Sequence, residues 1–258
     1  MKKKKIIKII NKKNKVKIVC LTAYSKSMAK IIDEYCDIIL VGDSLGNVLY
    51  GFNNTHTVSL QMMINHAKSV SKGIKKSVFV VDMPKNSYNN IKNAKKNAKK
   101  IINQTNCDAV KIESNNKNYS IINSLVKSNI NVMGHIGFTP QYKKKFKAEG
   151  FSTKEEKKLM VEAEKIQKAG AFSIVLECVS SKVSNKITRN LKIPTIGIGS
   201  SKNCDGQILV TDDMLGLSGF YPKFVKKYVN LKKIIKKGVK NYRKDIISGN
   251  FPGKSNSY

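Results

Sequence analysis

The chain has 258 residues, of which 41% are hydrophobic, and its 49 basic and 17 acidic residues give a formal net charge of +32. This length and apolar content suit a globular domain with a sizeable core, and they exclude a disordered chain. Only Arg189 and Arg243 are arginines, which leaves 49 − 2 = 47 lysines spread along the whole sequence. A dedicated nucleic-acid site usually clusters its basic residues and favours arginine. We therefore attribute the charge to nucleotide bias in the genome and expect no specific nucleic-acid binding.

Eight short apolar runs recur along the chain, and most are followed by a stretch with a helical pattern. The runs are rich in Ile and Val and nearly continuous in apolar character, which is typical of strands buried on both faces of a parallel sheet. In chain order the predicted strands span residues 16–22, 37–43, 77–83, 109–113, 131–137, 172–178, 194–199 and 207–212. The helical patterns span residues 27–35, 59–72, 89–104, 119–128, 153–169 and 181–190.

This alternation favours an α/β fold of the closed (β/α)8 TIM barrel type over an open doubly wound sheet. Residues 222–247 read as one or two extra C-terminal helices, which we expect outside the barrel or against another subunit. No linker or low-complexity block divides the chain, so we predict a single catalytic domain over residues 1–258.

The cysteines and the apolar runs bear on location. The five cysteines are odd in number and show no CxxC spacing, which favours reduced thiols in a cytoplasmic compartment. No run approaches the roughly 18 apolar residues of a membrane span. The basic N-terminal stretch lacks the apolar core of a signal peptide, so we expect a cytoplasmic protein with no membrane partner.

Ionisable side chains lie at the ends of five predicted strands. They are Asp43, Asp82, Glu113 with Lys111 two positions earlier, His135 and Glu177. The carboxyl ends of barrel strands face one mouth, where active sites lie. Three carboxylates meeting there would repel each other unless a cation lies among them, and oxygen ligands suit a hard cation such as Mg²⁺.

Each of these residues also has a simpler explanation. Asp43 could cap a helix, and Asp82 could belong to a turn with the following Met-Pro. Lys111 and Glu113 could pair as ions, since residues two apart share one face of a strand. His135 could be a hydrogen-bonded core histidine. Glu177 is hardest to explain in this way, because burying a carboxylate after an apolar strand is costly.

The sequence resembles the ketopantoate hydroxymethyltransferase (3-methyl-2-oxobutanoate hydroxymethyltransferase) family over nearly its whole length. Many blocks match in the same order. They are LTAY at 21–24, VGDSLG at 41–46, DMP at 82–84, VKIE at 110–113, GHIG at 134–137, TPQ at 139–141, LEC at 176–178, IPTIGIG at 193–199, DGQILV at 205–210, PKF at 222–224 and FP at 251–252.

The resemblance implies transfer of a hydroxymethyl group from methylenetetrahydrofolate to the keto acid 3-methyl-2-oxobutanoate, giving 2-dehydropantoate for pantothenate synthesis. The positions of the family's Mg²⁺ ligands match Asp43, Asp82 and Glu113. The keto acid meets both aspartates and also the residues matching Ser44 and Lys111. The family's proton acceptor matches Glu177, and the family commonly assembles as a homo-oligomer, a decamer.

The implied mechanism is enolate chemistry. Mg²⁺ would bind the carboxylate and keto oxygen of the substrate, and as a Lewis acid it would stabilise the enolate that forms when the C3 proton leaves. Lys111 adds positive charge beside the developing oxyanion. The enolate carbon then attacks the one-carbon unit of the folate.

Three departures from the family pattern are clear. Ser25 replaces the usual Asp after LTAY, and Lys85 replaces the usual Phe after DMP. The glycine-rich loop after TPQ is replaced by a shorter, lysine-rich stretch at 142–150. We expect this loop to affect the lid and folate affinity more than the metal chemistry.

Two other functions are compatible with parts of the sequence. A Schiff-base aldolase could use Lys111 as its nucleophile. Such a mechanism, however, does not require the three carboxylates predicted beside the lysine. Borohydride trapping with keto acid present would reveal it. A basic nucleic-acid-binding protein rests on the net charge alone, and titrating duplex binding against salt would test it.

Overall fold

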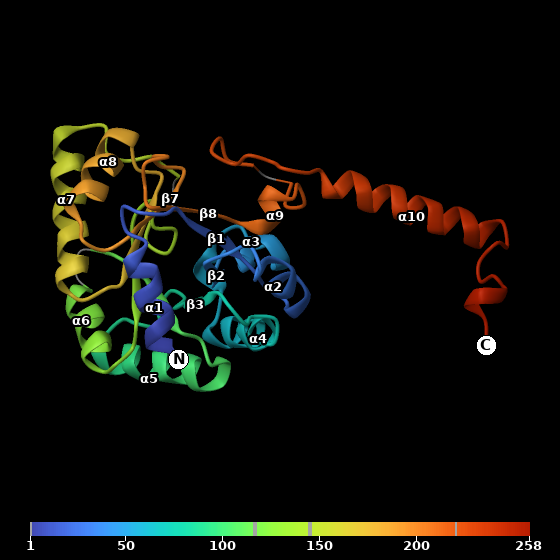
Figure 1. Ribbon diagram of the computed structural model, residues 1–258, viewed down its shortest axis with the longest axis horizontal. Coiled ribbons are helices and arrows are strands. Elements are labelled where there is room, and N and C mark those ends of the chain that lie inside the picture. Colours follow the sequence, from blue (N-terminus) through green and yellow to red (C-terminus); the bar gives the residue numbers. More distant parts are fainter. Residues whose placement is uncertain (1, 116–117, 144–145, 220) are drawn as a thin grey trace. The chain divides into compact units, whose positions relative to one another are not determined.

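Eight parallel strands form a closed barrel in the computed structural model, which describes residues 2–115, 118–143, 146–219 and 221–258 (Figure 1). Strands pair in chain order, and β8 pairs with β1 to complete the ring. The strands are β1 (Ile18–Thr22), β2 (Ile38–Val41), β3 (Val78–Asp82), β4 (Ala109–Glu113), β5 (Val132–Gly137), β6 (Ser173–Glu177), β7 (Thr195–Ile198) and β8 (Gly206–Leu209). The predicted TIM barrel is confirmed, and each of the eight predicted runs overlaps one strand.

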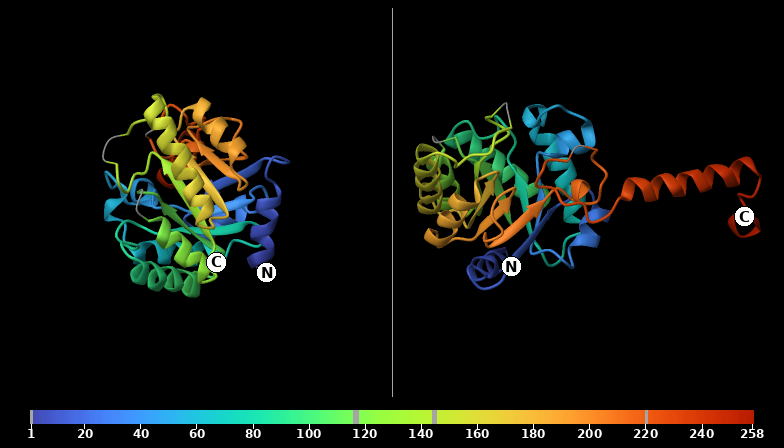
Figure 2. Two further views of the ribbon diagram at one scale, coloured as in Figure 1. Left: turned by 90° about the vertical axis from the view of Figure 1, so that its left-hand side faces the viewer. Right: turned by 90° about the horizontal axis from the view of Figure 1, so that it is seen from above.

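The helices of the barrel unit lie around the ring of strands. They are α1 (Lys2–Asn11), α2 (Lys26–Ile32), α3 (Leu45–Tyr50), α4 (Leu60–Ser71), α5 (Ile91–Thr105), α6 (Tyr119–Lys127), α7 (Thr153–Lys168) and α8 (Ser181–Asn190), with a 3-10 turn η1 (Thr55–Thr57). Helices α2 to α8 connect successive strands. Figure 2 shows α4 to α8, coloured teal to light orange, outside the ring. All six predicted helical patterns overlap a helix. Helices α1 and α3 were not predicted. The apolar residues of α1 were read only against a signal peptide, and the six residues of α3 are too few to show a helical period.

The predicted start and end of α7 are confirmed in detail. Its N-cap Ser152 accepts a hydrogen bond from the backbone N–H of Glu155 at 3.2 Å. The Glu155 carboxylate in turn accepts the backbone N–H groups of Gly150 and Phe151 at 3.0 Å each. After the helix ends, Gly170 takes a positive φ of +95°, a conformation that favours glycine.

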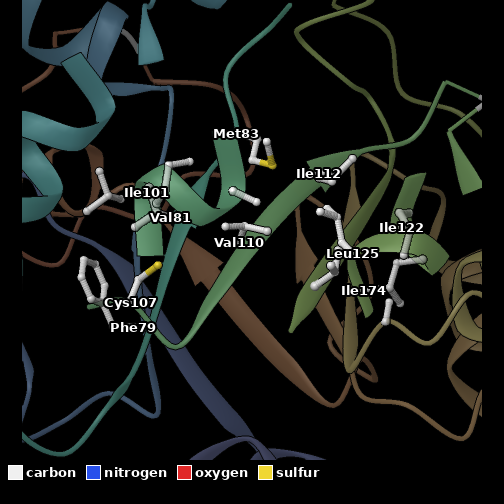
Figure 3. Packing of buried hydrophobic residues seen from close by; sticks show 14 of the residues in the cluster. Phe79, Val81, Met83, Ile101, Cys107, Val110, Ile112, Ile122, Leu125 and Ile174 are labelled. Atoms are coloured by element: carbon white, nitrogen blue, oxygen red, sulfur yellow. The ribbon is translucent and has the colours of Figure 1, made fainter. Parts of the chain in front are cut away.

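The main core lies between the outer face of the barrel and the surrounding helices. Figure 3 shows Val81 of β3 and Val110 of β4 near Ile101 of α5, and Ile174 of β6 near Leu125 of α6. All five side chains are fully buried. Each such side chain contributes about 1.5–3 kcal/mol of transfer free energy, so this layer holds the helices against the strands.

A second core fills the barrel interior and is covered by α1. Ile6 and Ile9 of α1 are buried and pack with inward-facing residues of the strands. Lys2 and Lys5 each donate to a backbone carbonyl at 2.9 Å, just ahead of β4 and β3 respectively. The helix therefore closes the end of the barrel where the strands begin.

A buried ion pair lies at this same end. Lys13 Nζ is 2.7 Å from Asp205 Oδ2, with side chains 9% and 3% exposed. Asp205 also accepts the backbone N–H groups of Asn14 at 3.1 Å and Thr195 at 2.8 Å. All of these partners donate hydrogen bonds to the carboxylate of Asp205, so its negative charge is compensated. Its role is therefore structural.

The chain divides into two compact units, Met1–Val210 and Thr211–Tyr258. The first holds the barrel. The second contains α9 (Thr211–Met214) and α10 (Leu231–Ile247), with a 3-10 turn η2 (Lys254–Asn256). One long helix thus lies within the region 222–247, where one or two were predicted. A single domain over residues 1–258 stays a prediction. No helix in the described part of the chain has the length and apolar character to span a membrane.

Candidate active site

The alternation of side chains along the strands directs five ionisable residues into the barrel interior. Each lies two or four positions after an interior core residue of its own strand. These core residues are Val80, Ala109, Met133 and Val175. Residues two apart on a strand point the same way. The ionisable set comprises Asp82 of β3, Lys111 and Glu113 of β4, His135 of β5 and Glu177 of β6. They lie toward the carboxyl ends of the strands, the mouth where barrel enzymes carry their active sites.

Asp82 links the turn after β2 to strand β4. Its Oδ1 lies 2.7 Å from Lys111 Nζ, and its Oδ2 accepts the backbone N–H of Asp43 at 3.0 Å. Lys111 therefore pairs across strands with Asp82 rather than along its own strand with Glu113. Asp43 does not cap α3, whose N-cap residue is Ser44. The structure thus brings three of the predicted site residues, Asp43, Asp82 and Lys111, together.

Glu113, His135 and Glu177 form a second group across three adjacent strands. Glu113 Oε1 is 3.6 Å from His135 Nδ1, and His135 Nε2 is 3.2 Å from Glu177 Oε2. Burial, and then the positive charge of Lys111, lower the pKa of His135 well below its usual value. Burial raises the pKa of Glu177 to about 7, and the positive charge of Lys111 acts in the opposite direction. A neutral imidazole beside a carboxyl that titrates near neutrality is suited to proton transfer.

The carboxyl groups of Asp43, Asp82 and Glu113 and the ammonium of Lys111 affect one another's charge. Burial and the negative charge of Asp82 raise the pKa of Asp43 to about 7. Burial and the charge of Asp43 likewise raise the pKa of Glu113. Burial alone would lower the pKa of Lys111, but the charges of Asp82, Asp43 and Glu113 raise it overall. One ammonium thus faces three carboxylates, so the site carries an excess of potential negative charge.

Two glycines set the backbone around the histidine of the GHIG block. A Cβ on Gly134 would lie 2.5 Å from Ile166 of α7, so glycine allows that helix to approach the strand. Gly137 has a φ of +90°, and a Cβ there would lie 2.1 Å from the backbone oxygen of Glu177. These glycines are needed for close packing beside the predicted base.

Ser44, a predicted substrate contact, shares a hydrogen bond of 2.8 Å with the hydroxyl of Tyr24, from the LTAY block. The backbone carbonyl of Tyr24 lies 2.8 Å from His66 Nδ1, and His66 Nε2 lies 3.0 Å from the hydroxyl of Tyr50. His66 is therefore a structural residue that joins Tyr24, which follows β1, to Tyr50 of α3. Ser25, the first departure, caps α2 by accepting the backbone N–H of Met28 at 3.3 Å.

Lys85, the second departure, contacts a histidine. Its Nζ is 3.2 Å from His56 Nδ1, and His56 Nε2 lies 2.9 Å from the carbonyl oxygen of Pro140. A carbonyl oxygen can only accept, so Nε2 donates and Nδ1 accepts from the lysine. This chain of contacts ties η1, which lies between α3 and α4, to the segments that follow β3 and β5.

The shortened stretch 142–150 is partly described, with residues 144–145 outside the described part. Lys143 donates to the carbonyl oxygen of Gly137 at 2.6 Å and forms an ion pair with Glu149. The ring of Phe146 packs edge-on against Phe138 at 5.1 Å between centroids. These contacts tie the described parts of the loop to the end of β5.

The structure adds one site residue that the sequence analysis did not single out. Gln141, the last residue of the TPQ block, is 1% exposed and contacts both Asp43 and Glu113. The available signal was its place in the TPQ block, one of the blocks that match the family, but no role was assigned to it.

The donor chemistry of the carboxylates fits a divalent cation. In the described part of the chain no three His, Cys, Asp or Glu side chains form a ready-made metal site. Mg²⁺, however, typically takes one or two carboxylates and completes its shell with water and substrate oxygens. Asp43 and Asp82 are buried and lie next to each other, and Lys111 is the one ammonium beside them. Two carboxylates can carry more negative charge than one ammonium compensates, so the residues present fit this mode of binding.

Comparisons with known proteins show the family of the chain. The sequence profile described as "Ketopantoate hydroxymethyltransferase" matches residues 3–254. The 3-methyl-2-oxobutanoate hydroxymethyltransferase of Pelagibacter ubique is 52% identical over 255 residues and covers 99% of both chains. That of Anaplasma marginale is 46% identical over 256 residues, 98% of this chain and 92% of the relative.

Solved structures show the same fold at low identity. Phosphoenolpyruvate phosphomutase from Streptomyces platensis subsp. rosaceus superposes with a TM-score of 0.63 at 11% identity, over 95% of this chain and 88% of that one. A 2,3-dimethylmalate lyase gives a TM-score of 0.63 at 12% identity, over 98% and 91%. These likenesses bear on the barrel alone, whereas the profile and the two relatives align over nearly the whole length of the chain. The chain belongs to the ketopantoate hydroxymethyltransferase family.

Proposed function

We propose that this chain transfers a hydroxymethyl group from methylenetetrahydrofolate to 3-methyl-2-oxobutanoate, with water supplying the hydroxyl oxygen, giving 2-dehydropantoate and tetrahydrofolate. The observation that carries the proposal is the convergence of Asp43, Asp82, Lys111, Glu113 and Glu177 at one barrel mouth, in a chain of this family. The reaction must remove a proton from C3 of the keto acid and stabilise the resulting charge. The site holds a candidate group for each task.

Lys111 supplies the fixed positive charge. Its ammonium is buried and held by Asp82 at 2.7 Å, so it costs no reorganisation when the keto oxygen of the substrate gains negative charge. Ser44 lies in the turn after β2 and offers a hydroxyl for the substrate carboxylate. Asp43, the neighbour of Ser44 in the chain, is bonded to Asp82, the partner of Lys111, which supports grouping these residues as substrate contacts.

Glu177 accepts the C3 proton. It ends β6, its side chain is 18% exposed, and His135 contacts its carboxylate from β5. A carboxylate with a pKa near 7 is a far stronger base than one with an ordinary value, and half of it is still ionised at neutral pH. Partial exposure gives the substrate access to the group.

Asp43 and Asp82 would hold Mg²⁺, with Glu113 completing the carboxylate set. When bound, the cation would supply Lewis-acid polarisation of the keto group. The carboxylates themselves favour cation binding, because they outnumber the ammonium they surround. Removing the metal should therefore raise repulsion within the site as well as weaken keto acid binding.

Folate is the proposed donor of the one-carbon unit, and the stretch 142–150 is the proposed place where folate affinity differs from that of relatives. Homo-oligomeric assembly, a decamer as the family resemblance implies, and a cytoplasmic location also belong to the proposal. The large positive charge is assigned no nucleic-acid role.

The Schiff-base alternative is disfavoured by the charge environment of Lys111. A Schiff-base lysine must lose its proton to become a nucleophile, and its pKa is usually lowered by burial or by another cation. Here three carboxylates raise the pKa instead. The amine is therefore held in the ammonium form.

The experiment that tests the function is a folate-dependent assay with purified protein. We expect 2-dehydropantoate to form only when keto acid, methylenetetrahydrofolate and Mg²⁺ are all present, and to cease when a chelator is added. Turnover that persists in chelator would reject the metal assignment. Absence of product with all three present would reject the reaction.

A further inference from the structure

Gln141 makes hydrogen bonds to four different residues at the barrel mouth. Its Nε2 donates to Asp43 Oδ2 at 2.8 Å and to the backbone carbonyl of Met83 at 3.0 Å. Its Oε1 accepts from the hydroxyl of Tyr88 at 2.5 Å. Its backbone N–H donates to Glu113 Oε2 at 3.0 Å. Two carboxylates of the site, on different segments of the chain, are therefore tied to one residue.

The orientation of the Gln141 amide is fixed by its neighbours. The carbonyl of Met83 can only accept, so it must face the NH₂ group, and the second N–H then points at Asp43. Tyr88 donates to the remaining oxygen. A flipped amide would put its oxygen against a carbonyl and a carboxylate, which is repulsive. Tyr88 is 2% exposed, so this arrangement is shielded from bulk solvent.

We infer that Gln141 is a positioning residue that holds Asp43 and Glu113 in place for the divalent cation. The inference rests on the proposed function, because it assumes a cation at these carboxylates. One oxygen of each carboxylate is bonded to Gln141, which restricts rotation of the group and spreads its charge. Outer partners of this kind typically change metal affinity about 10–100-fold when removed.

A simpler role would be to fasten the turn 139–141 to the barrel. That role needs only the bond to Met83 and would not involve the carboxylates. It predicts that removal of the amide changes stability but leaves cation affinity unchanged, so the two roles give different results.

The probe is Mn²⁺ alone, with free Mn²⁺ counted by its electron paramagnetic resonance signal at increasing protein concentration. The key variant is Gln141→Met, which keeps an unbranched side chain of similar length but makes none of the three side-chain hydrogen bonds. The matched control is Gln167→Met. Gln167 accepts the backbone N–H of Lys192 at 2.6 Å and of Ile193 at 3.2 Å, where the chain enters β7 at the opposite end of the barrel.

We expect Gln141→Met to bind Mn²⁺ about 10–100-fold more weakly than the parent, and Gln167→Met to bind as the parent does. In turnover assays, Gln141→Met should need more Mg²⁺ for half-maximal activity and recover most of kcat at saturating Mg²⁺. Loss of fold alone would not produce this split between metal requirement and kcat.

Tyr88→Phe keeps the glutamine and removes one donor, so it serves if the first variant fails to fold. We expect it to weaken Mn²⁺ binding about 2- to 10-fold, the range of one neutral hydrogen bond. Parent-like Mn²⁺ affinity in a folded Gln141→Met, or in Tyr88→Phe if only that variant folds, would overturn the inference. Failure of the parent itself to bind Mn²⁺ would instead reject the metal site of the proposed function, and this inference with it.

Discussion

Replacing Glu177 by glutamine tests the proposed base most directly. The substitution keeps the shape of the side chain and its 3.2 Å contact with His135, but it removes the basic oxygen. Loss of a general base typically costs about 10²–10⁴-fold in rate. We expect exchange of the C3 proton of 3-methyl-2-oxobutanoate with deuterated solvent to slow by this factor.

The exchange can be followed by proton NMR with Mg²⁺ and keto acid but without folate, which isolates proton removal from the later transfer step. Binding of Mg²⁺ and keto acid, measured by calorimetry, should stay within a few-fold of the parent, because no proposed binding contact is removed. The matched control is Glu162→Gln, which makes the same change on α7, outside the barrel, where Glu162 faces Lys158 at 3.9 Å.

The pH dependence of the exchange rate tests the same assignment in a second way. Burial raises the pKa of Glu177 to about 7, and only its ionised form accepts a proton. The exchange rate of the parent should therefore rise with pH through about 7, and at one unit below it only about a tenth of the molecules are active. Glu177→Gln should lack this rise. Exchange at the parent's rate in the variant would show that another group is the base, and His135 would be the next residue to test.

Four further outcomes are expected. Asp43→Ala and Asp82→Ala should each abolish turnover while the far-ultraviolet circular dichroism stays unchanged; normal turnover of either at saturating Mg²⁺ would contradict the metal assignment. Borohydride with keto acid should leave Lys111 unlabelled by mass spectrometry, because its amine is held as an ammonium. Asp205→Ala should lower the free energy of unfolding by about 3–5 kcal/mol, since it leaves a buried lysine unpaired, and a change below about 1 kcal/mol in urea unfolding would refute this. Duplex DNA binding should vanish at physiological salt, and tight salt-resistant binding would overturn the interpretation of the lysine excess.

The barrel could be predicted from the sequence because each strand is an apolar run with a clear end. The ionisable residues at those ends could likewise be grouped at one place, since parallel strands in a barrel bring their carboxyl ends to one mouth. Asp82 and Lys111 illustrate this, being paired residues in the register of β3 and β4. Which of these ionisable residues form ion pairs with one another could not be predicted. Lys111 and Glu113 share a strand face, yet the lysine forms its ion pair with the neighbouring strand.

Other features depend on contacts between distant segments and left no local pattern. Helix α1 is held by two buried isoleucines and by lysines that bond to backbone carbonyls 105 and 72 positions away. Gln141 lies 98 positions from Asp43, and its membership of the TPQ block does not tell which residues it contacts. Lys85 bonds to His56 across 29 positions. Such long-range polar contacts become visible only in the folded chain.

The two buried lysine–aspartate pairs show why geometry alone does not separate structure from chemistry. Lys13–Asp205 and Lys111–Asp82 each have a 2.7 Å contact, and all four side chains are less than 10% exposed. The difference lies in what surrounds each carboxylate. Asp205 is surrounded by N–H donors, so its charge serves to hold the closed end of the barrel. Asp82 has the carboxyl groups of Asp43 and Glu113 beside its lysine, so one ammonium cannot compensate all three when they are ionised. That surplus is what a cation and a proton-transfer site require, and it lies at the end of the barrel where the strands finish.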